Sequence, residues 1–277
     1  MKDCIRTTLN IGGDLIFIRH SSLHPGRPTL LFLHGLGDSS LAFDEAFIDE
    51  HCRDFDIVAP DLPGHGFSPP AADGAYTLEA LASLLEALTE RMALQRLTVV
   101  GHSLGGDIAT VFASRNRSGR IERIVNVEGS LTPADAFITN RAVEAAAGGF
   151  AAFDSWFHRY FCEETVFNDW AQKGEAGRRY YASLRFCEPS TFLACAAELY
   201  ARNRHANNVG LSGIGAIYAA LPMHKCFVYG TKSLPAVSAR RAAELELERH
   251  AFPAGHWVMI DAAPQFYRVL RSTVLAM

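Results

Sequence analysis

The sequence predicts an α/β protein: a mostly parallel sheet with helices on both faces and a helical segment inserted between two core strands. Short apolar, β-branched runs alternate with segments of helical periodicity up to about residue 127 and again from residue 225. Loops rich in glycine and proline follow the strand-like runs. Between 130 and 215 the chain is rich in Trp, Tyr, Ala and Arg and shows no clear strand pattern, which predicts the helical insertion.

The predicted elements follow one another in the order of a doubly covered sheet. Continuous apolar runs are typical of strands buried on both faces, and we expect them at Thr29–His34, Asp56–Pro60, Leu97–Gly101, Arg123–Glu128, Lys225–Gly230 and Leu247–Phe252. Helical spacing predicts helices at Thr77–Met92, Leu104–Asn116, Val237–Glu244 and Pro264–Leu275. The expected division is core (1–129), helical cap (130–215) and core (216–277).

Composition and charge narrow the functional classes. The net charge is −4, and no basic stripe or Lys/Arg run with interleaved aromatics appears, so we expect no nucleic-acid partner. The N-terminal segment carries charges throughout, and no stretch reaches the length of a membrane span, which predicts a cytoplasmic protein with no membrane partner. The six cysteines form no CxxC pair and are expected to be small buried thiols. The expected partner is a small-molecule substrate, and the sequence leaves open whether the protein forms a homodimer.

A serine between two glycines is the strongest chemical signal. The stretch Val-Val-Gly-His-Ser-Leu-Gly-Gly places Ser103 in a G-x-S-x-G motif that follows an apolar strand and opens a helix. Neighbours without a Cβ let the backbone close tightly around a nucleophile. The helix then directs its first N–H groups toward developing negative charge. The alternative is a plain turn serine without chemistry.

A second glycine-rich turn and one histidine complete the chemical inventory. His34-Gly35-Leu36-Gly37-Asp38 ends an earlier strand, and the N–H of Leu36 can face the same point as the N–H of Leu104, which would make an oxyanion hole. Among 11 histidines, His256 lies in a loop after a late strand and before the C-terminal helix, which favours it as the base. His34 and His102 belong to the two glycine turns and are interpreted as structural.

In this order, HG-x-G, D-L-P-G-H-G-F-S, G-H-S-L-G-G and a late A-G-H-W resemble the α/β-hydrolase superfamily over nearly the whole chain. The resemblance implies a helical cap at 130–215 over the active site. It also implies Ser103 as nucleophile, His256 as base, and Leu36 and Leu104 as oxyanion donors. Asp61 matches a family position that usually stabilises loops and is not expected to be catalytic.

The acid departs from the family pattern. A carboxylate is most often found in a G-x-x-D turn after the strand that follows the cap, but here that turn is Gly230-Thr231-Lys232-Ser233. Glu128 ends the strand next to the one carrying Ser103 and keeps the order serine, acid, histidine. We therefore expect Glu128 to be the acid, with Asp107 and Asp261 as weaker candidates and a salt bridge to a cap arginine as the alternative role of Glu128.

These residues predict a serine hydrolase that acts on a small or medium, largely apolar carboxylic ester, lactone or thioester through an acyl-enzyme. No metal-ligand spacing or dinucleotide motif appears, so no metal and no cofactor is expected. Two alternatives stay open: a non-catalytic member of the same fold that binds a small molecule, supported by the vacant acid turn, and a hydrolase of C–C bonds.

Overall fold

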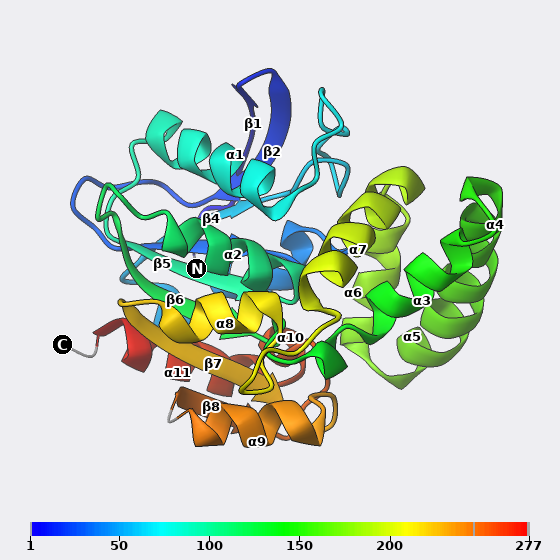
Figure 1. Ribbon diagram of the computed structural model, residues 1–277. Coiled ribbons are helices and arrows are strands. Elements are labelled where there is room, and N and C mark those ends of the chain that lie inside the picture. Colours follow the sequence, from blue (N-terminus) through cyan, green and yellow to red (C-terminus); the bar gives the residue numbers. More distant parts are fainter. Residues whose placement is uncertain (1, 246, 276–277) are drawn as a thin grey trace.

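An eight-stranded sheet forms the centre of the computed structural model, which describes residues 2–245 and 247–275 (Figure 1). Its strands are β1 (Ile5–Ile11), β2 (Asp14–His20), β3 (Thr29–Leu33), β4 (Asp56–Pro60), β5 (Leu97–His102), β6 (Ile121–Val127), β7 (His224–Gly230) and β8 (Glu248–Phe252). The order is β1-β2-β4-β3-β5-β6-β7-β8. β1 and β2 are antiparallel to their neighbours, whereas β3 to β8 run parallel.

Helices cover both faces of this sheet, as the apolar strands require. Figure 1 shows α1, α2, α8 and α9 in front of the sheet and α11 behind it. Their bounds are α1 (Leu78–Arg91), α2 (Leu104–Ser114), α8 (Gly213–Ala220), α9 (Ala236–Glu244), α10 (Val258–Asp261) and α11 (Ala263–Leu275). Short 3₁₀ turns lie at η1 (Ser40–Phe47), η2 (Glu50–Cys52) and η3 (Pro133–Asp135). The side chain of Thr77 caps α1 by accepting the N–H of Ala80.

A separate group of helices lies at one side of the sheet, between β6 and β7 in the chain (Figure 1). It consists of α3 (Phe137–Ala146), α4 (Phe150–Ser155), a π-type helix η4 (Trp156–Trp170), α5 (Ala171–Lys173), α6 (Glu175–Leu184) and α7 (Pro189–Asn203). Its interior is aromatic: Phe153, Phe157, Phe161 and Phe192 are buried and pack ring against ring. We call these helices the insertion.

The α/β-hydrolase fold expected from the sequence is therefore present, with its parallel strands within one or two residues of the predicted bounds. The antiparallel pair β1 and β2 was not predicted. The expected end of the cap at residue 215 falls inside α8, which packs on α2 of the core. All six cysteines are free thiols, five of them buried. Within the described part of the chain, no helix has the length and apolar character needed to cross a bilayer.

Candidate active site

Ser103 occupies a strained turn between β5 and α2. Its backbone is left-handed, with φ 52° and ψ −120°. The turn is held because the Ser103 N–H donates to the carbonyl of Val127 over 2.9 Å. The flanking glycines are required: a Cβ on Gly101 would lie 2.2 Å from the Gly105 oxygen, and a Cβ on Gly105 would lie 2.1 Å from the Leu33 oxygen. The sequence motif therefore folds into a sharp turn that exposes the serine at the carboxyl end of β5.

The glycine-rich loop after β3 packs directly against this turn. A Cβ on Gly35 would lie 3.2 Å from the Cβ of Ser103. Leu104 is the first residue of α2, so its N–H has no acceptor within the helix. The loop is also fixed from the insertion, because the Tyr180 hydroxyl donates to the Leu36 carbonyl over 3.0 Å. The residues predicted as oxyanion donors, Leu36 and Leu104, thus lie on two elements that meet at Ser103.

Glu128 follows β6 and contacts His256 at the carboxyl end of the sheet. The backbone of Glu128 is left-handed, with φ 53°. Its Oε2 lies 2.6 Å from Nδ1 of His256. Its Oε1 accepts the N–H of Gly230 over 2.6 Å and the hydroxyl of Ser233 over 2.5 Å. The serine at the turn where the family usually carries its acid therefore hydrogen-bonds a carboxylate supplied by the neighbouring strand.

The loop that carries His256 is held by two further contacts. Nε2 of His102 lies 3.1 Å from the His256 carbonyl, which accepts a hydrogen bond from the ring. Burial lowers the pKa of His102 well below its usual range, so this ring is neutral at physiological pH. Next to it, Nε1 of Trp257 donates to Oδ2 of Asp38 over 2.9 Å. Asp38 ends the Gly35–Gly37 loop, so this contact ties the histidine loop to the loop beside Ser103.

The other carboxylates considered from the sequence have different partners. Asp107 accepts hydrogen bonds from the N–H and the hydroxyl of Ser130. Asp261 accepts the N–H of Gly255 over 3.1 Å. Asp61 accepts the N–H groups of Ser40 and Phe67, which stabilises the loops after β3 and β4. Among the described residues, Glu128 is the carboxylate that hydrogen-bonds the His256 ring.

Ser103, Glu128 and His256 line one pocket beneath the insertion, with an empty volume of about 620 Å³ that includes its open mouth. Its apolar lining consists of Leu36, Leu104, Ala136, Phe137, Ile138, Tyr180, Leu199 and Trp257. Three buried or nearly buried acids, Asp38, Asp107 and Asp135, border it as well. Burial raises the pKa of Asp38 and of Asp107 to about 6. The pocket is therefore apolar with buried acidic groups in its wall, an environment that disfavours an anionic ligand.

Sequence reasoning missed three contacts of this site: Ser233 with Glu128, Tyr180 with Leu36, and Trp257 with Asp38. Each joins residues more than 100 positions apart, and no local pattern reports such a contact. The aromatic content of 130–215 did suggest that aromatic side chains approach the pocket. Of the two insertion tryptophans, Trp170 packs edge to face against Trp257, whereas Trp156 stacks on Phe161 inside the insertion.

With this geometry established, comparison with known proteins identifies the class. A family model described as alpha/beta hydrolase fold matches residues 28–173, just over half of the chain. The protein belongs to this family. It is similar to an uncharacterised protein of Mycobacterium tuberculosis, 41% identical over 87 residues, which are 31% of this chain. The chain spans only a quarter of that relative's length.

Solved structures also resemble the chain over nearly its whole length. An enol-lactonase from Burkholderia xenovorans superposes with a TM-score of 0.76 at 17% identity, covering 98% of this chain and 100% of that one. An E-2-(acetamidomethylene)succinate hydrolase has a TM-score of 0.74 at 17% identity, covering 99% and 100%. At these identities the likeness establishes the fold and leaves the chemistry to the site.

Proposed function

We propose that this protein is a serine hydrolase that cleaves a small or medium, largely apolar carboxylic ester, lactone or thioester through an acyl-enzyme on Ser103. The observation that carries the proposal is the 2.6 Å contact between Glu128 and Nδ1 of His256. It lies in the same pocket as a serine held on a strained strand-to-helix turn. A base oriented by a carboxylate, in the same pocket as a serine hydroxyl, is the arrangement that nucleophilic acyl transfer requires.

In this proposal each residue has one role. His256 accepts the proton of Ser103 as its oxygen attacks the carbonyl carbon, and the N–H groups of Leu36 and Leu104 stabilise the resulting oxyanion. Glu128 keeps the proton on Nδ1, so that Nε2 is free to act as base, and its charge stabilises the imidazolium. His256 then protonates the leaving group, and water repeats the sequence to release the acid and restore Ser103.

The side chains that line the pocket favour the binding of a neutral, apolar acyl group. Eight apolar or aromatic side chains line the pocket that contains Ser103. The carboxyl groups of Asp38 and Asp107 already accept hydrogen bonds from the protein, so they offer no free partner to a substrate. Their negative charge near neutral pH would raise the free energy of a bound carboxylate substrate. We therefore place neutral esters, lactones or thioesters ahead of anionic ones.

Active-site labelling tests this proposal directly. A fluorophosphonate probe should label the wild-type protein at Ser103, and the label should be absent from Ser103→Ala. A series of p-nitrophenyl esters of increasing acyl length, together with neutral lactones, should be hydrolysed by the wild type. Loss of the nucleophile should lower kcat by at least about a thousandfold.

The exposed Ser118 provides a matched control, because Ser118→Ala removes a hydroxyl far from the pocket and should leave both readouts unchanged. A wild-type protein that neither reacts with the probe nor hydrolyses any ester or lactone would instead be a small-molecule binding protein. Labelling at a residue other than Ser103 would contradict the assignment of the nucleophile.

A further inference from the structure

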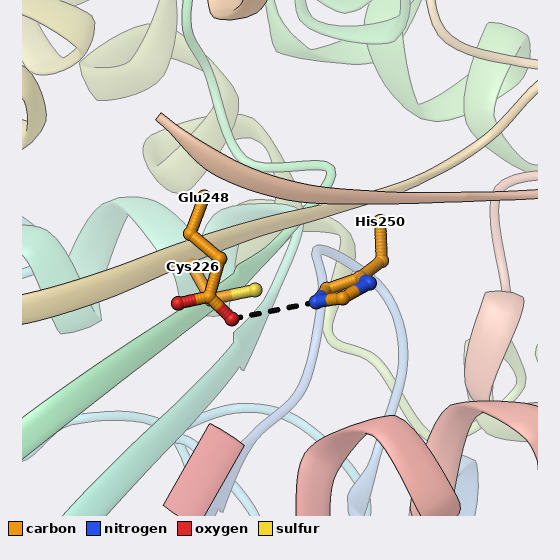
Figure 2. Close-up of side chains that lie close together, drawn as sticks. All are labelled: Cys226, Glu248 and His250. Atoms are coloured by element: carbon orange, nitrogen blue, oxygen red, sulfur yellow. Dashed lines mark hydrogen bonds and ion pairs between the residues drawn. The ribbon is translucent and has the colours of Figure 1, made fainter. Parts of the chain in front are cut away.

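A cluster of metal-ligating side chains lies on β7 and β8, outside the pocket. Ligand atoms of Cys226, Glu248 and His250 all lie within 4.8 Å of one another. Figure 2 shows the three side chains converging, with the Glu248 carboxylate beside the Cys226 sulfur and facing the His250 imidazole. A fourth candidate ligand, His224, contacts Glu248 through Nε2 over 2.8 Å.

The two strands bring these residues together through their alternation. β7 contains His224-Lys225-Cys226 and β8 contains Glu248-Arg249-His250, so each strand offers two candidate ligands at a spacing of two. Residues two apart on a strand lie on the same face. The register pairs Cys226 with Glu248, which aligns both sets on one face of the sheet. The hydroxyl of Thr273, on α11, contacts Glu248 over 3.3 Å and shows that this face is the one covered by α11.

We propose that Cys226, Glu248 and His250 form a binding site for a zinc-class divalent transition metal, with His224 or water as the fourth ligand. A thiolate combined with imidazole and carboxylate is a ligand set suited to zinc, because it joins a soft donor to borderline and hard ones. Two anionic ligands and neutral imidazoles also balance the charge of a dication. Without a metal, the ion-pair partners of Glu248 are two histidines, which are charged only when protonated.

The geometry requires only a modest adjustment. Zinc holds ligands at roughly 2.0–2.3 Å, which places neighbouring ligand atoms about 3.3–3.8 Å apart. The side chains of Glu248 and His250 are each 37% exposed, so they can rotate to close the remaining distance of about 1 Å. Cys226 is fully buried, and burial raises the pKa of its thiol. Metal binding would therefore release the thiol proton to the solvent.

The cluster also lies away from the reaction proposed above. His224 and Glu248 begin β7 and β8, whereas Gly230, which contacts Glu128, ends β7. A bound metal would join the edge strand β8 to β7 and would take no part in acyl transfer. The two proposals can therefore fail independently.

Cobalt(II) provides the test, because a thiolate ligand produces a sulfur-to-cobalt charge-transfer band in the near ultraviolet. The full-length protein, first treated with a chelator, should bind one equivalent of Co²⁺ and show this band, and Zn²⁺ should abolish it by displacement. Cys226→Ser should lose the band. His250→Gln, a change at a partly exposed residue, should weaken Co²⁺ binding by at least about tenfold.

Two control variants separate this site from incidental binding. Cys52→Ser removes a buried thiol elsewhere in the fold, and His205→Gln removes an exposed imidazole, so both should retain the band and the affinity. The absence of a charge-transfer band in the wild type at one equivalent of Co²⁺ would overturn the proposal. A band that persists in Cys226→Ser would overturn it as well.

Discussion

Ser103 and Glu128 follow neighbouring strands, β5 and β6, and both have a left-handed backbone, with φ of 52° and 53°. They differ in what holds them. The Ser103 turn depends on glycines two residues away on either side, because any side chain there would clash with nearby backbone. The Glu128 carboxylate depends on Gly230, Ser233 and His256, which lie more than 100 residues further along the chain. The proposed nucleophile is therefore positioned by local sequence, and the proposed acid by tertiary structure.

This difference explains how the proposed acid can follow β6, although the family usually carries it in the turn after the next strand. Gly230 and Ser233 donate an N–H and a hydroxyl to Oε1 of Glu128, so a carboxylate at position 233 would lie beside the place that the Glu128 carboxylate now occupies. Here the carboxylate comes from Glu128, and Ser233 has become its hydrogen-bond donor. The proposed nucleophile could not be supplied from another strand in this way, because its turn is formed by consecutive residues.

The largest effect on the acid side should come from Glu128→Gln. The Gln carbonyl can still accept the Gly230 and Ser233 hydrogen bonds, but its NH₂ group then faces Nδ1 of His256. This favours the tautomer with the proton on Nε2, which cannot accept the proton of Ser103. Because the equivalent change in a serine protease costs about 10⁴-fold, we expect kcat on the best ester to fall by at least about a hundredfold.

The double variant Glu128→Gln with Ser233→Asp sharpens this test. An aspartate at the usual family position should restore a carboxylate near His256 and recover part of the lost kcat. The matched control is Glu128→Gln with Ser233→Ala, which supplies no charge and should recover none. Near wild-type kcat in Glu128→Gln alone would exclude Glu128 as the acid.

The strands, the covering helices and the Ser103 turn could be predicted because their causes are local. Apolar runs, helical periodicity and the clash of any Cβ at Gly101 or Gly105 all act within a few residues. Glu128 was predicted as the acid because it keeps the chain order serine, acid, histidine and because Ser233 replaces the usual carboxylate. The hydrogen bond between these two residues was not predicted, since it depends on β6 and β7 being neighbours in the sheet.

Other parts escaped prediction for related reasons. β1 and β2 form an antiparallel pair at the sheet edge, and their alternating polar and apolar residues fit such a pair. This alternation was not interpreted as a strand pair from the sequence. The insertion was predicted to be helical, but which of its side chains reach the pocket depends on how its helices pack. Phe137, Ile138 and Tyr180 line the pocket, whereas Trp156 lies in the aromatic interior of the insertion.

A smaller effect should come from Tyr180→Phe. This variant tests whether the loop next to Ser103 is positioned by its own sequence alone or also by the insertion. The variant keeps the ring against Trp257 but removes the hydroxyl that donates to the Leu36 carbonyl. A loosened loop would misplace the Leu36 N–H. We expect kcat to fall by about three- to tenfold with little change in KM, because a donor acting on the transition state is affected more than substrate binding.

Tyr181→Phe is the control on the same helix, because Tyr181 donates to Glu163 within the insertion and does not touch the loop. It should leave kcat unchanged. Thermal unfolding of both variants shows whether a lower kcat reflects partial unfolding. Equal kcat values for Tyr180→Phe and Tyr181→Phe would mean that the insertion does not position the loop.

The smallest effect concerns the pH dependence of stability, and it tests the buried support of the loop next to Ser103. Beneath the loop next to Ser103, His34 and His65 pack ring against ring, 5.2 Å apart, and are fully buried. Burial lowers the pKa of His34 to about 4 and that of His65 to about 3. Between each folded pKa and the ordinary value of 6.5, the unfolded chain binds more protons. The folded state therefore loses stability as the pH falls from about 6.5 to about 4 for His34 and to about 3 for His65.

Asp38 and Asp107 act in the opposite direction over part of this window. Their folded pKa of about 6 means that the folded state binds more protons between pH 4 and 6, so they favour folding as the pH falls.

A single variant therefore isolates the histidine contribution. His65→Asn can keep a donor toward the Pro63 carbonyl, which the ring now contacts over 3.0 Å, but it cannot bind a proton. Denaturant unfolding from pH 4 to 7 should show a shallower loss of unfolding free energy in His65→Asn than in the wild type, whereas the exposed His205→Asn should not change the slope. Equal slopes for wild type and His65→Asn would mean that burial of the His65 ring does not lower the stability of the fold in acid.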